Sequence, residues 1–206
     1  MQINNLYKKA FKHLESDPIM KYLILKLGKE VDITDRYNDN YSKAIADIII
    51  EQQISFKAAI TIKKKFNSLI KGLSDLEVIN LKEKYFREIG ISHRKIEYIK
   101  NVYKYFLNNK IDFKSLVNDE IIRELISIKG VGSWTAEMFM IFILFRENIF
   151  SKKDLALINS IKLNYNIKNL TDIKLNKLIS SWSPYNTYAS LLLWKSIEEK
   201  VFFKKN

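Results

Sequence analysis

Glycine and proline are scarce in this chain, with five glycines and two prolines among 206 residues. A sheet of short strands needs such residues at many of its tight turns, so their scarcity argues against a β-rich fold. Apolar residues instead recur at helical spacing, as in Ile19, Leu23 and Leu27 after the helix-start signal Asp17-Pro18. The sequence therefore predicts an all-α fold.

The expected helices follow one another with short connections. Gly28 is expected to end the first of them, and Ser55 to cap a helix in which Ala59, Ile60 and Phe66 face inward. The longest apolar run, over 138–145, is too short to span a bilayer, which needs about 18 residues. Further helices are expected over 42–53, 75–80, 82–88, 93–108, 113–117, 119–127 and 134–145, and another that opens at 154.

The composition narrows the possible chemistry. The chain has no cysteine and two histidines, His13 and His93, which excludes disulfides, thiol nucleophiles, iron–sulfur clusters and a histidine-rich metal cluster. A net charge of +12 favours a polyanionic partner, but most of the 35 basic residues are lysines, a bias that compositional drift also produces. No membrane-spanning or targeting segment is visible, so we expect no membrane contact and a location in the cytoplasm of a prokaryote or in a nucleus. We also expect a monomer.

Two of the five glycines lie two residues apart in the string IKGVGSWTAE, residues 128–137. Gly130 and Gly132 join two expected helices, with Val131 tucked between them. Glycines before a helix leave amide N–H groups pointing outward, and such a nest suits a phosphate oxygen. By itself the string also fits a simpler interpretation, in which Gly130 caps a helix and Gly132 is a turn residue.

Longer strings resemble one protein family. LISIKGVGSWTAEMF is similar to the helix-hairpin-helix of DNA glycosylases, and NIFSKKDLALINSIK places Asp154 where these enzymes carry a carboxylate after the hairpin. IADIIIEQQISFKAAITIKKKF, GISHRKIEYIKNVYKYF and WSPYNTYASLLLW resemble further segments of the family, in the same order. Together these segments cover most of residues 42–194 and resemble the 3-methyladenine DNA glycosylase II branch.

The resemblance implies a fold and an organisation. It implies a two-lobed helical DNA glycosylase fold without the N-terminal β domain of longer members. One lobe is expected over 43–147 and ends in the helix-hairpin-helix; 1–42 and 148–206 would form the other. The damaged base would enter a pocket between the lobes.

Asp154 has two compatible interpretations. An aspartate that opens a helix accepts main-chain N–H bonds and suits the helix dipole, so the residue type alone indicates a cap. By resemblance Asp154 is the catalytic residue. Its charge would stabilise an oxocarbenium-like sugar and orient the attacking water.

Trp134 bears on the reaction and on the substrate. Relatives that also cut the strand carry a lysine nucleophile at this position, so Trp134 implies a monofunctional enzyme that leaves an abasic site. An aromatic face also attracts the positive charge of a methylated purine, although ordinary core packing would explain the residue as well. The residues expected around the base are Trp134, Met138, Phe150, Leu155, Trp182 and Tyr185.

The resemblance also implies how DNA is held. The loop QQIS would enter the minor groove and fill the gap left by the flipped base; alternatively, Gln52 is a buried amide and Ile54 a core residue. The residues expected at the DNA are Gln52, Gln53, Ile54, Ser55, Lys129, Gly130, Val131, Gly132, Ser133 and Thr135. Backbone carbonyls of Ile126, Ile128 and Val131 would hold a monovalent cation, Na⁺ or K⁺; no other cofactor is expected.

The chain departs from the family at three positions. Asn186 stands where an arginine is common, and Leu155 and Met138 stand where some members have aromatic residues. The leading hypothesis is an alkylpurine-DNA glycosylase acting on damaged double-stranded DNA in base excision repair. The alternative is a non-catalytic damage sensor of the same fold, favoured by these departures and disfavoured by Asp154. A glycosylase/lyase for oxidised bases is disfavoured by Trp134.

Overall fold

The computed structural model describes residues 2–204, and within them every regular element is a helix. This agrees with the predicted all-α class. The chain divides into two compact units. We call residues 36–144 the central unit, and residues 1–35 together with 145–206 the terminal unit. The lobe was expected over 43–147, whereas the central unit begins at residue 36 and ends at residue 144.

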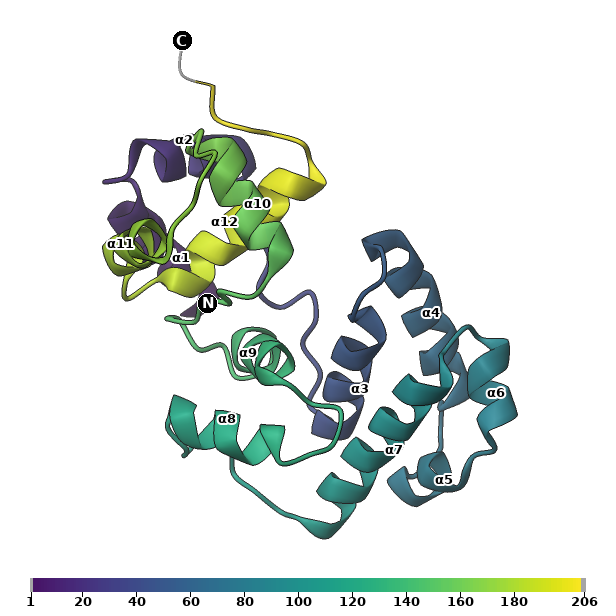
Figure 1. Ribbon diagram of the computed structural model, residues 1–206. Helices are drawn as coiled ribbons and strands as arrows, with labels where there is room; N and C mark the ends of the chain where they lie inside the picture. The colour runs from purple at the N-terminus through teal and green to yellow at the C-terminus, as the bar shows by residue number, and fades with distance from the viewer. Residues whose placement is uncertain (1, 205–206) are drawn as a thin grey trace. The chain divides into compact units, whose positions relative to one another are not determined.

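The central unit is built around one long helix. Its helices are α3 (Tyr41–Glu51), α4 (Phe56–Leu69), α5 (Asp75–Asn80), α6 (Glu83–Glu88), α7 (His93–Asn108), α8 (Asn118–Ile126) and α9 (Ser133–Phe142). In Figure 1, α7 runs beside α3, and α5 and α6 also pack on it. Ile45 and Ile49 of α3 and Ile96 and Ile99 of α7 are fully buried in this core. The helix α9 packs on α3 and α8.

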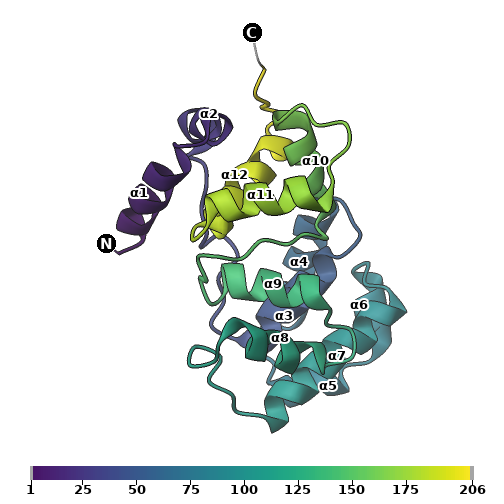
Figure 2. The same cartoon turned by 60° about the vertical axis from the view of Figure 1, so that its left-hand side comes forward.

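The terminal unit combines the two ends of the chain. It contains α1 (Gln2–Leu14), α2 (Pro18–Leu27), α10 (Leu155–Asn164), α11 (Asp172–Trp182) and α12 (Asn186–Glu198). All four other helices pack against α12, which Figure 2 shows in yellow beside α10 and α11. Small residues such as Ala189, Ser190 and Ser196 are fully buried on α12 and let its neighbours approach closely. No helix within residues 2–204 is long and apolar enough to cross a membrane.

Side-chain caps set several helix starts. Asp17 accepts the amides of Ile19 and Met20, which fixes the start of α2 at the predicted place. Ser55 accepts the amide of Ala58 and starts α4, again as predicted. These bonds span two or three residues, which is why the sequence alone located them.

Four sequence-based expectations about the helices are wrong. Residues 113–117 form a turn, because the Asp112 side chain accepts the Lys114 amide and its carbonyl accepts the Ser115 hydroxyl. Ile60 is 49% exposed instead of buried. The helix α9 ends at Phe142, earlier than predicted, and α3 ends at Glu51 instead of residue 53.

One partly buried carboxylate in the central unit has a hydrogen-bond partner for only one of its two oxygens. Asp47 Oδ2 pairs with Lys43 Nζ at 3.3 Å, but Asp47 Oδ1 is buried without a hydrogen-bond partner. Burial raises the pKa of Asp47, against the opposing effect of Lys43 and Lys63. The folded state therefore binds this proton more tightly than the unfolded state, and the contribution of Asp47 to stability falls as pH rises above the ordinary carboxyl range.

We expect Asp47→Asn to raise the free energy of unfolding by about 1 kcal/mol at neutral pH, because it removes a poorly solvated charge. Urea denaturation of both proteins between acidic and neutral pH measures this difference. It should shrink at acidic pH, where Asp47 itself is protonated. A variant that is less stable at neutral pH would mean that the pair with Lys43 outweighs the cost of burial.

Candidate functional site

The hairpin between α8 and α9 uses its two glycines differently. Gly130 has φ +103°, and a Cβ added there would lie 2.1 Å from Cγ of Tyr98. Gly132 has φ −103°, and a Cβ there would meet no atom within 4 Å. The close approach that requires the first glycine is thus to Tyr98, whereas the space beside Gly132 is open to another molecule.

The helix α7 supports this hairpin through side-chain contacts. Lys129 Nζ lies 2.5 Å from Oε1 of Glu97, and this hydrogen bond lowers the pKa of Glu97. Asn101 Nδ2 donates to the Lys129 carbonyl at 3.3 Å. Together with the Tyr98 ring, these contacts hold residues 129–130 from about one turn of α7.

The residues of the hairpin differ in how far they are exposed to solvent. Val131 is 5% exposed, as expected for a residue tucked between two helices, and its amide donates to the Ile128 carbonyl at 3.0 Å. Ser133, the first residue of α9, is half-buried. The Lys129 side chain is 71% exposed although it is paired with Glu97.

The turn of residues 52–55 joins α3 to α4 and carries the predicted wedge. Gln53 is exposed and has φ +56°, a left-handed conformation that side chains other than glycine adopt rarely. Ile54 is 36% exposed, so it is not the core residue of the simpler interpretation. Ser55 is exposed, and its side chain caps α4.

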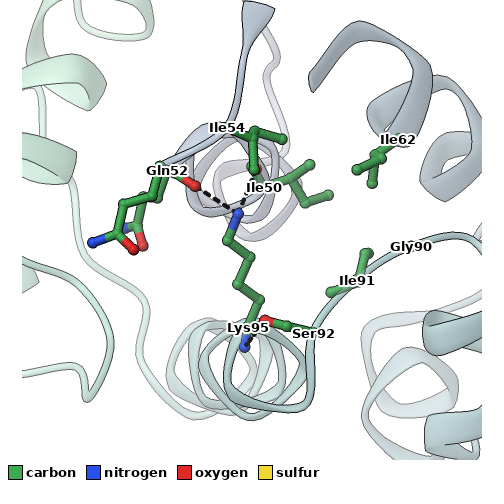
Figure 3. Close-up of a pocket in the computed structure, with 9 residues that line it drawn as sticks. Ile50, Gln52, Ile54, Ile62, Gly90, Ile91, Ser92 and Lys95 are labelled. Carbon is green, nitrogen blue, oxygen red and sulfur yellow. Dashed lines mark hydrogen bonds between the residues drawn. The ribbon is translucent and has the colours of Figure 1, made fainter. Parts of the chain in front are cut away.

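Two side chains from other elements hold this turn, as Figure 3 shows in part. Gln52 Nε2 donates to Thr135 Oγ1 on α9 at 3.0 Å. Lys95 of α7 donates to the carbonyls of Ile50 and Gln52 at 2.8 and 2.7 Å (Figure 3). Burial lowers the pKa of Lys95. The alternative interpretation made Gln52 a buried amide that satisfies the loop; in the structure Gln52 is half-buried, and its amide bonds α9 instead of the loop.

This arrangement corrects one prediction and adds one residue. Thr135, which was expected at the DNA, is 1% exposed, and its hydroxyl oxygen accepts a hydrogen bond from the Gln52 side chain. Lys95 had no predicted role. Its string GISHRK resembled a family segment, but nothing local indicates that its ammonium reaches a turn more than 40 residues earlier.

Asp154 is the N-cap of α10 in the terminal unit. Its Oδ1 accepts the amide of Leu157 at 3.0 Å, and its own amide donates to the carbonyl of Ser151 at 3.1 Å. The residue is 9% exposed. The cap predicted from the residue type is thus present, and it fixes the orientation of the carboxylate.

The segment that leads to Asp154 is tied to the start of α12. The Thr187 hydroxyl donates to the Arg146 carbonyl at 2.6 Å and accepts the Ile149 amide at 3.1 Å. Asn186, which stands where the family commonly has arginine, is 4% exposed and donates to Asn148 Oδ1 at 2.6 Å. Asn186 therefore has a structural task in this chain: it anchors the loop before the carboxylate.

The terminal unit places the other predicted base-pocket residues in different surroundings. Trp182 is fully buried, donates its ring N–H to Asp17 Oδ2 at 3.2 Å and stacks obliquely on Phe150. This core position corrects its prediction as a pocket wall. Tyr185 is half-buried, and Leu155 is 77% exposed at the start of α10.

In the central unit, the two predicted pocket residues lie one turn apart on α9. Trp134 is half-buried in the first turn, and Met138 is 1% exposed. Only Trp134 of this pair therefore presents side-chain surface to a ligand. Within residues 2–204, no three His, Asp or Glu side chains come together in a group that could hold a metal ion.

Comparisons with known proteins identify the family of this chain. The sequence signature of the HhH-GPD superfamily base excision DNA repair proteins matches residues 46–184. DNA-3-methyladenine glycosylase 1 of Schizosaccharomyces pombe is 30% identical over 156 residues, which cover 72% of this chain and 68% of that protein. The Bacillus subtilis protein YfjP is 30% identical over 163 residues, 73% of this chain, but the chain spans only 56% of that relative's length.

A solved structure has a similar fold. The S. pombe 3-methyladenine DNA glycosylase Mag1, in complex with abasic DNA, is similar to this chain with a TM-score of 0.85 and 27% identity, over 92% of this chain and 97% of that one. Since the family signature itself spans more than half of the sequence and includes the hairpin, the chain belongs to the HhH-GPD superfamily of base excision DNA repair proteins.

Proposed function

We propose that this protein is a monofunctional DNA glycosylase that hydrolyses the N-glycosidic bond of alkylated purines in double-stranded DNA and leaves an abasic site. The observation that carries the proposal is Asp154, a nearly buried carboxylate held at the N-cap of α10 in a member of a base excision repair family. The names of the similar proteins, which refer to 3-methyladenine, support alkylated purines as the substrate class.

The chemistry needs little from the protein beyond this carboxylate. A methylated purine carries positive charge, so the electron pair of the C1′–N bond leaves with the base and neutralises it. The charge of Asp154 stabilises the oxocarbenium-like sugar that remains. A water molecule then adds to C1′, and its proton passes to Asp154 and on to solvent.

Other residues are proposed to hold the DNA and the base. The open space beside Gly132 lets a phosphate approach the amides that begin α9. The exposed side chains of Gln53 and Ile54 are suited to fill the gap that a flipped base leaves. Trp134 offers an aromatic face to a cationic base and no amine nucleophile.

We also propose that the carbonyls of Ile126, Ile128 and Val131 hold a monovalent cation beside the phosphate. The Ile128 carbonyl accepts the Val131 amide at 3.0 Å and keeps a second lone pair for an ion. DNA affinity should then be higher in K⁺ or Na⁺ than in tetramethylammonium at equal ionic strength, measured by fluorescence anisotropy. Equal affinity in all three would reject the cation site.

The activity is tested by incubating the protein with methylated duplex DNA and separating released bases by chromatography. We expect free methylated purines and an unbroken strand that breaks only after alkali treatment. Borohydride should trap no covalent protein–DNA complex, because Trp134 replaces the lyase lysine.

Two other outcomes would contradict the proposed function. A trapped complex would indicate a glycosylase/lyase. Specific binding to damaged DNA without release of any base would favour the damage sensor and reject the enzyme.

A further inference from the structure

The ammonium group of Lys95 binds main-chain oxygens at the end of a neighbouring helix. From the first turn of α7 its ammonium reaches the end of α3 and donates to two main-chain oxygens, Ile50 O at 2.8 Å and Gln52 O at 2.7 Å (Figure 3). The last carbonyls of a helix lack intrahelical partners and carry the negative end of the helix dipole. One partly buried ammonium thus holds the backbone where α3 passes into the turn of residues 52–55.

The apolar side chains beside the turn do not pack closely against it on that side. Beside it lies a cavity of about 240 Å³, which the residues around Lys95 line. The cavity walls include Ile50, Ile54, Ile62, Gly90 and Ile91. Figure 3 shows Lys95 reaching from α7 to the turn, with Gln52 on one side of it and Ile62 and Ile91 on the other. Because side chains do not fill this space, packing alone does not fix the position of Ile54.

The turn also has a conformation that needs support. Gln53 has φ +56°, and such a residue persists only where its surroundings stabilise it. Besides Lys95, the side-chain bond between Gln52 and Thr135 connects this turn to α9. Gln52 is thus held twice, through its side chain and through its carbonyl.

We propose that Lys95 is a positioning residue that fixes the turn of residues 52–55 in the conformation that enters DNA. It thereby governs extrusion of the target base and leaves cleavage of the glycosidic bond unaffected. The inference rests on the proposed function, in which Gln53 and Ile54 fill the gap in the duplex. The helix α7 then supports both DNA-facing elements, since Lys95 holds the turn and Tyr98 lies against Gly130 of the hairpin.

The test compares three variants on two substrates. Lys95→Met removes both carbonyl bonds, and Lys95→Arg keeps a cation that can donate to them. Lys100→Met is the matched control, because Lys100 also lies on α7 and donates to a main-chain oxygen, Leu81 O at 2.7 Å, away from the turn. The substrates are a duplex with 7-methylguanine paired with cytosine, and the same lesion in a single-nucleotide bulge, where it is already unpaired.

We expect Lys95→Met to slow single-turnover release from the paired substrate by about tenfold or more, the usual weight of a charged hydrogen bond. Release from the bulge should change by about twofold at most, because extrusion no longer limits the rate. Lys95→Arg and Lys100→Met should resemble the wild type on both substrates. Equal slowing on both substrates, or no slowing on either, would overturn the inference.

A second readout does not depend on activity. Fluorescence of 2-aminopurine opposite an abasic site should rise when the wild type binds and unstacks it, and should rise less with Lys95→Met at saturating protein. If the wild type releases no base but this difference is present, the proposed function fails and the positioning role stands. If the wild type is active and the fluorescence is unchanged by the substitution, the positioning role fails. Should Lys95→Met fold poorly, Lys95→Gln takes its place under the same criteria.

Discussion

Asp154→Asn is expected to lower the rate of methylated-purine release by about 100- to 1,000-fold, the usual effect of removing a group that stabilises transition-state charge. Asparagine keeps the size of the side chain and an oxygen that can accept the Leu157 amide, so the cap of α10 should survive. Base release under single-turnover conditions measures the loss. Thermal denaturation and DNA binding should change little.

Two further variants make this result specific. Asp154→Ser also provides a good N-cap and no charge, so it should be as inactive as Asp154→Asn and similarly stable. Asp172→Asn alters an exposed aspartate in the first turn of α11, in the same unit, and should leave activity unchanged. If Asp154→Asn keeps wild-type activity, Asp154 is only a helix cap and the mechanism is wrong.

The two hairpin glycines should respond oppositely to alanine. Gly130→Ala places a Cβ 2.1 Å from the Tyr98 ring at φ +103°, so we expect it to reduce the free energy of unfolding by about 2–5 kcal/mol. Gly132→Ala meets no atom within 4 Å and has an ordinary φ, so stability should stay within about 0.5 kcal/mol. Its Cβ would instead occupy the space proposed for a phosphate and weaken DNA binding.

Urea denaturation and fluorescence anisotropy with duplex DNA separate these two effects. A Tyr98→Ala background provides the control, since removal of the ring should make Gly130→Ala less costly than in the wild type. If Gly132→Ala binds DNA as tightly as the wild type, the hairpin amides do not contact phosphate in the proposed way. If Gly130→Ala is stable, the hairpin and Tyr98 have room to shift apart.

The elements that sequence reasoning located well depend on neighbours in the chain. Asp17 and Ser55 cap helices through bonds to residues two or three positions further on, and the start of α10 at Asp154 follows the same rule. The failure over 113–117 has a local cause as well. Asp112 satisfies the following amide and hydroxyl in a turn, a competitor that helical periodicity does not reveal.

The candidate site was predictable only in part. The hairpin and Asp154 could be located because they lie in contiguous strings, GVGSWTAE and FSKKD. Trp182 was misassigned because a large aromatic residue near a family segment does not reveal its burial, which depends on Asp17 and Phe150 from elsewhere in the chain. Lys95 had no predicted role because its partners lie 45 and 43 residues away.

The sequence by itself determined the helical character of this protein, most of its helix starts and its family, because each depends on short-range hydrogen bonds or on contiguous strings. Only the tertiary structure decided which glycine meets Tyr98, which side chain holds the turn of residues 52–55, and that Asn186 anchors the loop before Asp154. Those contacts join residues distant in the chain, and they form only when packing of the apolar helix faces brings them together.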